Sequence, residues 1–465
     1  MLLRFRVANY RSIREPVELS LVSSSLKTVV PENGDWNAAT VRVAGIFGAN
    51  GSGKSTVLSA LNFTSQAVRS SATTWAERPG FQHQPFRLDE TSKDEPSEFV
   101  VELVIEDVRY EYGFSANSEF VLTEWLHSYP HNRRRKLFER TAKHPGESTA
   151  DSNEVANFNF SRELAGDNWT AARTVLPHTL FLSAAANVRH KSLTRIAHRI
   201  GQHIKFARFE DADRLRRLQM IKKSFDSDSA SMGLLGAHLV KTADVGISTI
   251  AMREEEVSAE TAEILRRLLP DSKEPSGSSD LANVLASAKR RLFFGHAGHG
   301  GRVYELPEDR ESSGTLAWLS LAMPAVTSFR YGETLLVDEL DASLHPRLSA
   351  ALISLFRDPA VNTTGAQLIF TTHDTNLLSD SVGDPLRPDE VWFTEKNPVG
   401  ETELFSLTDF PTRDSDNFAK RYLAGRYGAT PIVDMKFLSN HEESTADEES
   451  VAGKTGSAAT QAIEA

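Results

Sequence analysis

Nine residues near the N-terminus have the types and the spacing of a phosphate-binding site. Residues 48–56 read Gly48-Ala49-Asn50-Gly51-Ser52-Gly53-Lys54-Ser55-Thr56, a complete G-x-x-x-x-G-K-S loop. Apolar residues at 41–47 predict a buried strand before the loop, and residues 56–61 predict the start of a helix after it. Strand, loop and helix in that order are the context that this motif requires.

The chemistry of this loop indicates a nucleoside triphosphate with magnesium. Glycines allow backbone N–H groups to turn toward phosphate oxygens, and the helix N-terminus adds positive partial charge. Residues 50–56 are therefore expected to contact ATP, with the Lys54 ammonium reaching the β- and γ-phosphates. The Ser55 hydroxyl is expected to bind Mg²⁺. The loop alone does not indicate what the nucleotide drives.

A second acidic motif lies nearly 300 residues further along the chain. The apolar run 335–337 ends in Asp338 and Glu339. An apolar strand followed by two carboxylates is common, but paired with a phosphate loop it indicates a catalytic site. Asp338 is expected to hold Mg²⁺ through water, and Glu339 is placed to polarise an attacking water. The strand 368–372 then ends in His373, which can hydrogen-bond the γ-phosphate or that water.

The elements around these motifs indicate a mixed α/β domain interrupted by a helical block. Residues 1–22 predict a strand, a turn and a second strand, and 141–170 predict a loop because they are polar without periodicity. The spacing of apolar residues turns helical from Ala184 to about Arg291. Further strand candidates are a hairpin over 99–114 and single strands over 119–129, 302–306, 334–337, 367–370 and 390–393.

We expect four segments along the chain. Residues 1–183 and 292–438 would form the two parts of one ATPase head, and 184–291 would form a helical insertion between them. Residues 439–465 predict a disordered acidic tail. The two parts of the head must meet in space, because the phosphate loop lies in one part and its partner motifs lie in the other.

Composition limits the possible classes of protein. The chain has 465 residues, 40% of them hydrophobic, and no cysteine, which excludes disulfides and thiolate metal sites. No apolar run approaches the roughly 18 residues of a membrane span, and the alternating N-terminus does not resemble a signal peptide. A cytoplasmic protein without membrane contact is therefore expected. The net charge of −11 is uneven, because residues 189–223 hold eleven Lys or Arg against three acids.

The order of the motifs resembles the head of an ABC-type ATPase. It runs from the phosphate loop through Glu311-Ser312-Ser313-Gly314-Thr315 and residues 338–346, Asp-Glu-Leu-Asp-Ala-Ser-Leu-His-Pro, to Thr-Thr-His at 371–373. The resemblance implies a P-loop head with a mixed sheet and an antiparallel β-subdomain. It also implies a head-to-tail homodimer in which Ser312 and Gly314 of one copy close on the ATP of the other.

The same resemblance assigns further residues. Asp341 would lie at the dimer seam and His373 would be the switch histidine. The turn at 7–13 resembles that of SMC, RecF and OLD-type ATPases, in which an arginine or serine contacts the nucleotide; Arg11 is therefore a candidate. Gln84 is the candidate for the family's magnesium-sensing glutamine. Glu-Ser-Ser-Gly-Thr departs from the Leu-Ser-Gly-Gly-Gln of transporters, which disfavours a transporter subunit.

A closer resemblance covers most of residues 1–435. The segments 85–89, 109–114, 124–126, 137–140, 311–315 and 425–429 resemble bacterial anti-phage defence ATPases of the RloA/AbiL type, related to the ATPase of the PARIS system. The resemblance implies a nucleotide-gated sensor that controls a separately encoded nuclease-like or Toprim-like effector and responds to a phage trigger protein.

Two alternatives remain open from the sequence. A DNA-repair ATPase of the RecF/SMC kind would use the basic block 189–223 to bind nucleic acid. The same block would equally suit an exposed helical arm or a dock for an acidic partner. The block lacks a sustained heptad pattern, which argues against a coiled-coil arm. Assemblies larger than a dimer are also compatible with the sequence.

Overall fold

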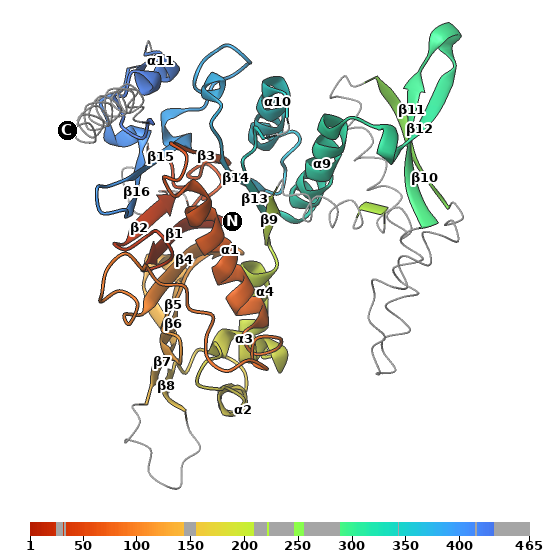
Figure 1. Ribbon diagram of the computed structural model, residues 1–465. Helices are drawn as coiled ribbons and strands as arrows, with labels where there is room; N and C mark the ends of the chain where they lie inside the picture. Colours follow the sequence, from red (N-terminus) through yellow and green to blue (C-terminus); the bar gives the residue numbers. More distant parts are fainter. Residues whose placement is uncertain are drawn as a thin grey trace, which may run out of the picture. The chain divides into compact units, whose positions relative to one another are not determined.

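The computed structural model describes residues 1–24, 31, 34–143, 155–208, 221–222, 246–254, 289–342, 344–413 and 416–431. Contacts divide the chain into Met1–Ala429 and Thr430–Ala465, and all the named elements lie in the first of these units (Figure 1). No helix in the described ranges is long and apolar enough to cross a membrane.

A six-stranded sheet carries both halves of the expected site. The strand order is β16-β15-β3-β14-β13-β9, with all neighbours parallel except the β15–β16 pair. The strands are β3 (Val43–Gly48), β9 (Ile204–Arg208), β13 (Thr334–Asp338), β14 (Gln367–Thr371), β15 (Val391–Lys396) and β16 (Thr402–Ser406). Strand β3 comes from the N-terminal part of the chain, yet it lies between β14 and β15.

The buried strands of this sheet place side chains alternately on two hydrophobic faces. Ala44 and Ile46 of β3 pack on one face with α1 (Lys54–Ser70), whereas Val43 and Phe47 pack on the other face. The second face is covered by α9 (Ser313–Tyr331) and α10 (Pro346–Arg357). Burial on both faces explains why these strands are continuous apolar runs rather than alternating ones.

A seven-stranded antiparallel sheet packs against the α1 side. Its order is β2-β1-β4-β5-β6-β7-β8 (Figure 1). The strands are β1 (Leu2–Ala8), β2 (Val17–Ser20), β4 (Ser97–Ile105), β5 (Val108–Ala116), β6 (Val121–Tyr129), β7 (Arg135–Ala142) and β8 (Ala156–Phe160). Residues of α1 share one hydrophobic cluster with both this sheet and the six-stranded sheet, so the helix is buried between them.

The remaining described elements are short. A three-stranded antiparallel sheet consists of β10 (Ile247–Glu254), β11 (Arg290–Ala297) and β12 (Val303–Pro307). The short helices are α2 (Asn168–Arg173), α3 (Phe181–Asn187), α4 (Leu193–Gly201) and α11 (Phe418–Leu423). The 3-10 turns are η1 (Pro130–Asn132), η2 (His299–Gly301), η3 (Glu308–Arg310), η4 (Thr375–Leu378), η5 (Pro388–Glu390) and η6 (Leu407–Asp409).

Most of the predicted strands are confirmed. The hairpin predicted over 99–114 is β4–β5, and its turn residues Glu106 and Asp107 both have positive φ, of 47° and 61°, as a two-residue hairpin turn requires. The predicted strands at 119–129, 302–306, 334–337, 367–370 and 390–393 correspond to β6, β12, β13, β14 and β15.

Two predictions of secondary structure are wrong in part. The segment 184–291, expected to be helical, includes α4, but its described residues also contain β9, β10 and the start of β11, and β9 is the edge strand of the main sheet. The segment 141–170, expected to be loop, contains β8 and the start of α2. Both β8 and β9 have five residues, too few to show a clear period. Residues 255–288 of the segment expected to be helical, the tail at 439–465 and Ser343 lie outside the described residues, and the four segment boundaries stay predictions.

A buried ion pair joins the antiparallel sheet to α3. Glu124 of β6 is fully buried and accepts hydrogen bonds from the backbone N–H groups of Phe181 (2.6 Å) and Leu182 (2.8 Å), at the start of α3. Its carboxylate lies 3.4 Å from the guanidinium of Arg140 on β7, which is also buried. Arg140 in turn donates to the carbonyl of Thr179, just before α3. The pair therefore fixes the approach of α3 to the sheet.

Arg140→Leu is expected to lower the free energy of unfolding by about 3–5 kcal/mol, because it leaves the Glu124 carboxylate buried without a partner charge. Urea denaturation of the purified protein measures this loss. Arg135→Ala is the matched control, since its ion pair with Glu163 is exposed and worth at most about 1 kcal/mol. Equal losses in the two variants would contradict the assignment.

Candidate nucleotide site

The phosphate loop has backbone conformations that only glycine adopts readily. Gly51 and Gly53 have φ of 76° and 106°, in the left-handed range that costs other residues free energy. A Cβ on Gly53 would lie 2.1 Å from the hydroxyl of Thr402, and a Cβ on Gly48 would lie 2.4 Å from the carbonyl oxygen of Thr394. The glycines are therefore required by conformation and by close packing.

Hydroxyl groups from distant parts of the chain hold this loop. The Ser52 and Thr394 hydroxyls lie 2.7 Å apart. The Thr402 hydroxyl lies 3.0 Å from the carbonyl oxygen of Ser52 and 2.9 Å from the hydroxyl of Ser12. Ser12 in turn donates to the hydroxyl of Thr56, on the first turn of α1, at 3.1 Å. Strands β15 and β16 and the turn after β1 thus set the position of the loop before any ligand binds.

Lys54 lies folded back over the loop. Its side chain is buried, and its Nζ donates to the carbonyl oxygens of Gly48 (2.8 Å) and Ala49 (3.0 Å). Burial lowers the pKa of this ammonium group from 10.5 to about 8, and the negative charges of Asp341, Glu339 and Asp338 oppose the shift. A buried cation with carbonyl partners but no close carboxylate partner is suited to binding phosphate oxygens.

The acidic motif meets the phosphate loop directly. The Ser55 hydroxyl donates to Oδ1 of Asp338 at 2.8 Å, although the two residues are 283 positions apart. The Thr371 hydroxyl also donates to this oxygen at 2.8 Å, and it accepts the backbone N–H of Glu339 at 2.7 Å. Parallel pairing causes this meeting, because the carboxyl ends of β3, β13 and β14 lie at one edge of the sheet.

Glu339 and His373 lie at the same edge with exposed side chains. The backbone of Glu339 has φ of 56°, a conformation that costs a non-glycine residue energy and is held here by the bond to Thr371. The backbone N–H of His373 donates to the Asp341 carboxylate at 3.2 Å. Burial and the charge of Lys54 lower the pKa of the His373 imidazole, and Asp341 and Glu339 oppose this shift. This shift favours the neutral imidazole over its charged form.

Ser312 and Gly314 lie at the beginning of α9. Ser312 caps the helix: its Oγ accepts the backbone N–H of Thr315 at 3.0 Å, and its side chain is exposed. The preceding loop is anchored to β11, where Glu311 pairs with His296 and Glu308 accepts the backbone N–H of Leu292. The described hydrogen bonds of Ser312 stay within α9 and do not reach the phosphate loop of the same chain.

Arg11 and Gln84 contact each other. Arg11 has φ of 52°, and its Nε donates to the side-chain oxygen of Gln84 at 2.8 Å. Its backbone N–H donates to the Gln84 carbonyl at the same distance. The hydrogen bonds described for this pair therefore join the two residues to each other, whereas the neighbouring Ser12 reaches α1. The assignment of Arg11 to the nucleotide and of Gln84 to the metal stays a prediction.

Several described residues of the basic block 189–223 contact other parts of the chain. Arg195 pairs with Glu106, and Arg199 donates to the carbonyl oxygens of Tyr331 and Gly332. Residues 209–220 and 223 lie outside the described ranges. Nucleic-acid binding by this block therefore stays a prediction.

The residues at this edge fit ATP and magnesium. The glycine conformations, the buried ammonium of Lys54 and the N-terminus of α1 are suited to phosphate oxygens. The Ser55 hydroxyl and the Asp338 carboxylate already share a hydrogen bond, and these are the oxygen donors that Mg²⁺ prefers. Sequence patterns missed the supporting hydroxyls of Thr394 and Thr402, since isolated Thr residues carry no motif. Ser12 and Thr371 lie in motifs quoted above, but those motifs did not predict their hydrogen-bond partners.

Nucleotide binding at pH 8.5 is expected to take up ~0.7 proton, because phosphate charge raises the lowered pKa of Lys54 again. Titration calorimetry in two buffers of different ionisation enthalpy measures the uptake. At pH 7 the uptake from Lys54 should fall to ~0.1 proton, since the free ammonium is then already protonated. In Lys54→Arg, any binding that remains should lack the uptake, because guanidinium stays charged. Equal uptake at both pH values would contradict the assignment.

Two solved structures of SMC heads are similar to this chain at low sequence identity. The SMC head bound to the C-winged helix domain of ScpA is 13% identical, with a TM-score of 0.39 over 87% of this chain and 97% of that chain. The SMC head domain from Thermotoga maritima is 10% identical, with a TM-score of 0.38 over 87% and 98%. No curated protein matches the chain.

A family model matches residues 43–379, well over half of the chain, from the strand before the phosphate loop to beyond His373. The matched range therefore includes the phosphate loop, the capping serine of α9, the acidic motif and the histidine. The chain belongs to the family described as AAA domain, putative AbiEii toxin, Type IV TA system.

Proposed function

We propose that this protein binds and hydrolyses MgATP at the edge of the six-stranded sheet. The observation that carries the proposal is the 2.8 Å hydrogen bond between Ser55 and Asp338. It joins the last part of the phosphate loop to the acidic strand end, so that a phosphate cradle and a pair of metal-binding oxygens form one site. Membership of an AAA-domain family supports the same function.

Each residue has a defined task in this proposal. The loop N–H groups and Lys54 bind the phosphates, and Ser55 and Asp338 hold the metal. Magnesium, when bound, supplies positive charge that offsets the charge on the phosphate oxygens. Glu339 orients and deprotonates the attacking water, for which its exposed carboxylate at the end of β13 is available. The neutral His373 imidazole hydrogen-bonds the γ-phosphate or that water.

A second copy of the chain would complete the site. Ser312 is exposed at the N-terminus of α9, where helix N–H groups favour anions. Its described hydrogen bonds do not reach the phosphate loop of its own chain. In a head-to-tail dimer with C₂ symmetry, Ser312 of each copy would face the phosphates held by the other, with Asp341 at the seam. ATP binding would then stabilise the dimer, and hydrolysis would release it.

The role of this ATPase is proposed from the family and from the sequence resemblance. The family description names a putative toxin and a Type IV TA system, and the sequence resembles defence ATPases of the RloA/AbiL type. We therefore propose that the ATP-dependent dimer serves as a sensor and scaffold in an anti-phage abortive-infection system. In this scheme a phage protein acts as the trigger, and a separately encoded nuclease-like or Toprim-like effector performs the toxic step.

Mixing two inactive variants tests the shared site. Lys54→Ala and Ser312→Arg are each expected to lack ATPase activity, because every site in either homodimer is damaged. In an equal mixture half of the dimers combine the two variants, and each of these has one intact site, so about a quarter of the wild-type activity should return. Steady-state phosphate release measures the recovery. Activity in the mixture no greater than in the separate variants would exclude the head-to-tail arrangement.

Phage challenge of cells that carry this gene with its neighbour tests the gating role. Lys54→Ala should abolish protection because it removes ATP binding. Glu339→Gln should bind ATP but hydrolyse it at a rate reduced at least about 100-fold. Protection by this variant would show that ATP binding alone suffices, and loss of protection would show that hydrolysis is needed. Plaque counts measure protection, and immunoblots control for the amount of protein. Full protection by a Lys54→Ala protein that binds no ATP would contradict nucleotide gating.

A further inference from the structure

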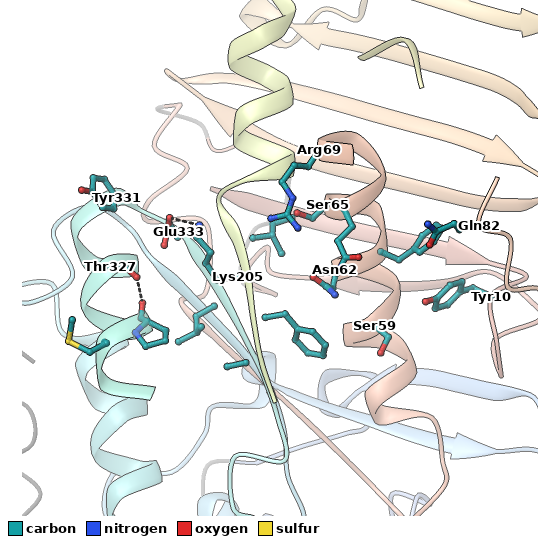
Figure 2. A pocket seen from close by; sticks show the side chains of 18 of the residues that line it. Tyr10, Ser59, Asn62, Ser65, Arg69, Gln82, Lys205, Thr327, Tyr331 and Glu333 are labelled. Carbon is teal, nitrogen blue, oxygen red and sulfur yellow. Dashed lines mark hydrogen bonds and ion pairs between the residues drawn. The ribbon is translucent and has the colours of Figure 1, made fainter. Parts of the chain in front are cut away.

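A cavity of about 780 Å³ lies beside α1, away from the phosphate loop. Its walls come from α1, α9, the edge strand β9, the turn at 10–11 and the side chains of Gln82 and Gln84 (Figure 2). Its lining includes Arg11 and Gln84, the predicted contacts of ATP and Mg²⁺, but none of Lys54, Ser55, Asp338 and Glu339. The volume falls within the roughly 300–1,000 Å³ of small-molecule sites. The cavity is therefore large enough for a ligand of its own.

Polar and apolar side chains lie on different sides of the cavity. Phe206, Leu335 and Met323 contribute apolar surface from the β9, β13 and α9 side. Asn62, Gln66 and Arg69 of α1 face this surface, and Figure 2 shows Asn62 and Arg69 on the side of α1 that is turned toward Lys205 and Glu333. Amide groups beside aromatic and apolar surface suit a planar heterocycle with hydrogen-bonding edges.

The charge of the wall favours an anion. Its described cationic side chains are Arg11, Arg69 and Lys205, and its described carboxylate is Glu333. Lys205 lies 3.5 Å from Glu333, and Arg11 contacts Gln84. Arg69 makes no hydrogen bond or ion pair with a described residue. A guanidinium that has no partner among the described residues is suited to binding a phosphate group with two parallel hydrogen bonds.

Glu333 supplies a second, independent sign of a ligand. The residue is only 6% exposed, and its Oε2 accepts no hydrogen bond from the described residues. The other carboxylate oxygen, Oε1, lies 3.5 Å from the ammonium of Lys205. A buried carboxylate oxygen without a donor costs free energy. A ligand hydroxyl or amino group at this position would satisfy it.

We propose that this cavity binds a nucleoside monophosphate, with its phosphate on Arg69, its base against the apolar wall and the amides of Asn62 and Gln66, and a ribose hydroxyl or base amino group on Glu333. The ligand combines an anionic end, a planar ring and hydrogen-bond donors, which are the three features that the wall requires. The source is either free nucleotide or the 5′ end of a nucleic acid strand, since both carry this chemistry.

Binding here would also influence the ATP site, and this second step rests on the proposed function. The cavity is lined by α1, which begins at Lys54, and by α9, which begins next to Ser312. A ligand between the two helices fixes their separation. It would thereby change how readily Ser312 of one copy meets the phosphates of the other, and so the ATPase rate.

Calorimetric titration with AMP tests the binding. The full-length protein is first saturated with a non-hydrolysable ATP analogue and Mg²⁺, so that heat from AMP reports a second site. Wild-type protein should bind one AMP per chain. Arg69→Ala should raise the Kd about tenfold or more through loss of a charged hydrogen-bonding partner. Arg173→Ala, an exposed arginine of α2 outside the cavity, is the control and should leave the Kd unchanged.

A second variant guards against a folding defect. Gln66→Trp adds bulk at the half-buried cavity wall and should abolish AMP binding while the melting temperature stays within a few degrees of wild type.

Lack of AMP binding by wild-type protein, or equal Kd values for Arg69→Ala and Arg173→Ala, would overturn the proposal. A short 5′-phosphorylated oligonucleotide that competes with AMP identifies a strand end as the source, and lack of competition identifies free nucleotide. AMP binding without any change in ATPase rate would refute only the coupling.

Discussion

Strand β3 carries the phosphate loop, and its hydrogen bonds to β14 and β15 are the contacts on which the candidate site depends. Phe370 of β14 pairs with Gly45, and Thr394 of β15 pairs with Gly48, across more than 300 residues of sequence. Because the strands are parallel, this register brings the ends of β3, β13, β14 and β15 to one edge of the sheet. A slip of one residue would turn every buried side chain of β3 to the opposite face. The buried clusters on both faces therefore fix the geometry of the site.

That register explains why the phosphate loop is held so closely before it binds anything. Thr394 at the end of β15 contacts Ser52, and Thr402 at the start of β16 contacts the backbone of the same residue. Each such hydrogen bond is worth about 1 kcal/mol. Together they offset part of the conformational entropy that is lost when Gly51 and Gly53 are fixed in one conformation. The loop is then preorganised, so binding energy is not used to order it.

Local motifs could be predicted from the sequence, whereas the contacts between them could not. The phosphate loop and the strand that ends in Asp338 and Glu339 follow from residue types at fixed spacing, and most strands follow from apolar runs. The segment predicted as loop contains β8, and the segment predicted as helical contains β9. Each of these strands has only five residues. Such short strands are stabilised by tertiary pairing rather than by their own pattern.

The supporting residues illustrate the same limit. The sequence segments that contain Glu124 and Arg140 resemble those of known ATPases. Only the structure shows that the two side chains are buried together against the start of α3. Thr371 looks like an ordinary strand end, yet its hydroxyl connects Asp338 with the backbone of Glu339. Such roles depend on which strand ends become neighbours, and that is decided by the whole sheet.

The position of Ser312 depends on a different set of contacts from that of the phosphate loop. The loop before α9 is fixed to the three-stranded sheet, through Glu311 with His296 and through Glu308 with the backbone of Leu292. The phosphate loop is fixed to β15, β16 and the turn after β1. In the proposed head-to-tail dimer, Ser312 of one copy and the phosphate loop of the other must lie in register. A partner that binds the small sheet would therefore act on the dimer through Ser312 without contacting the nucleotide.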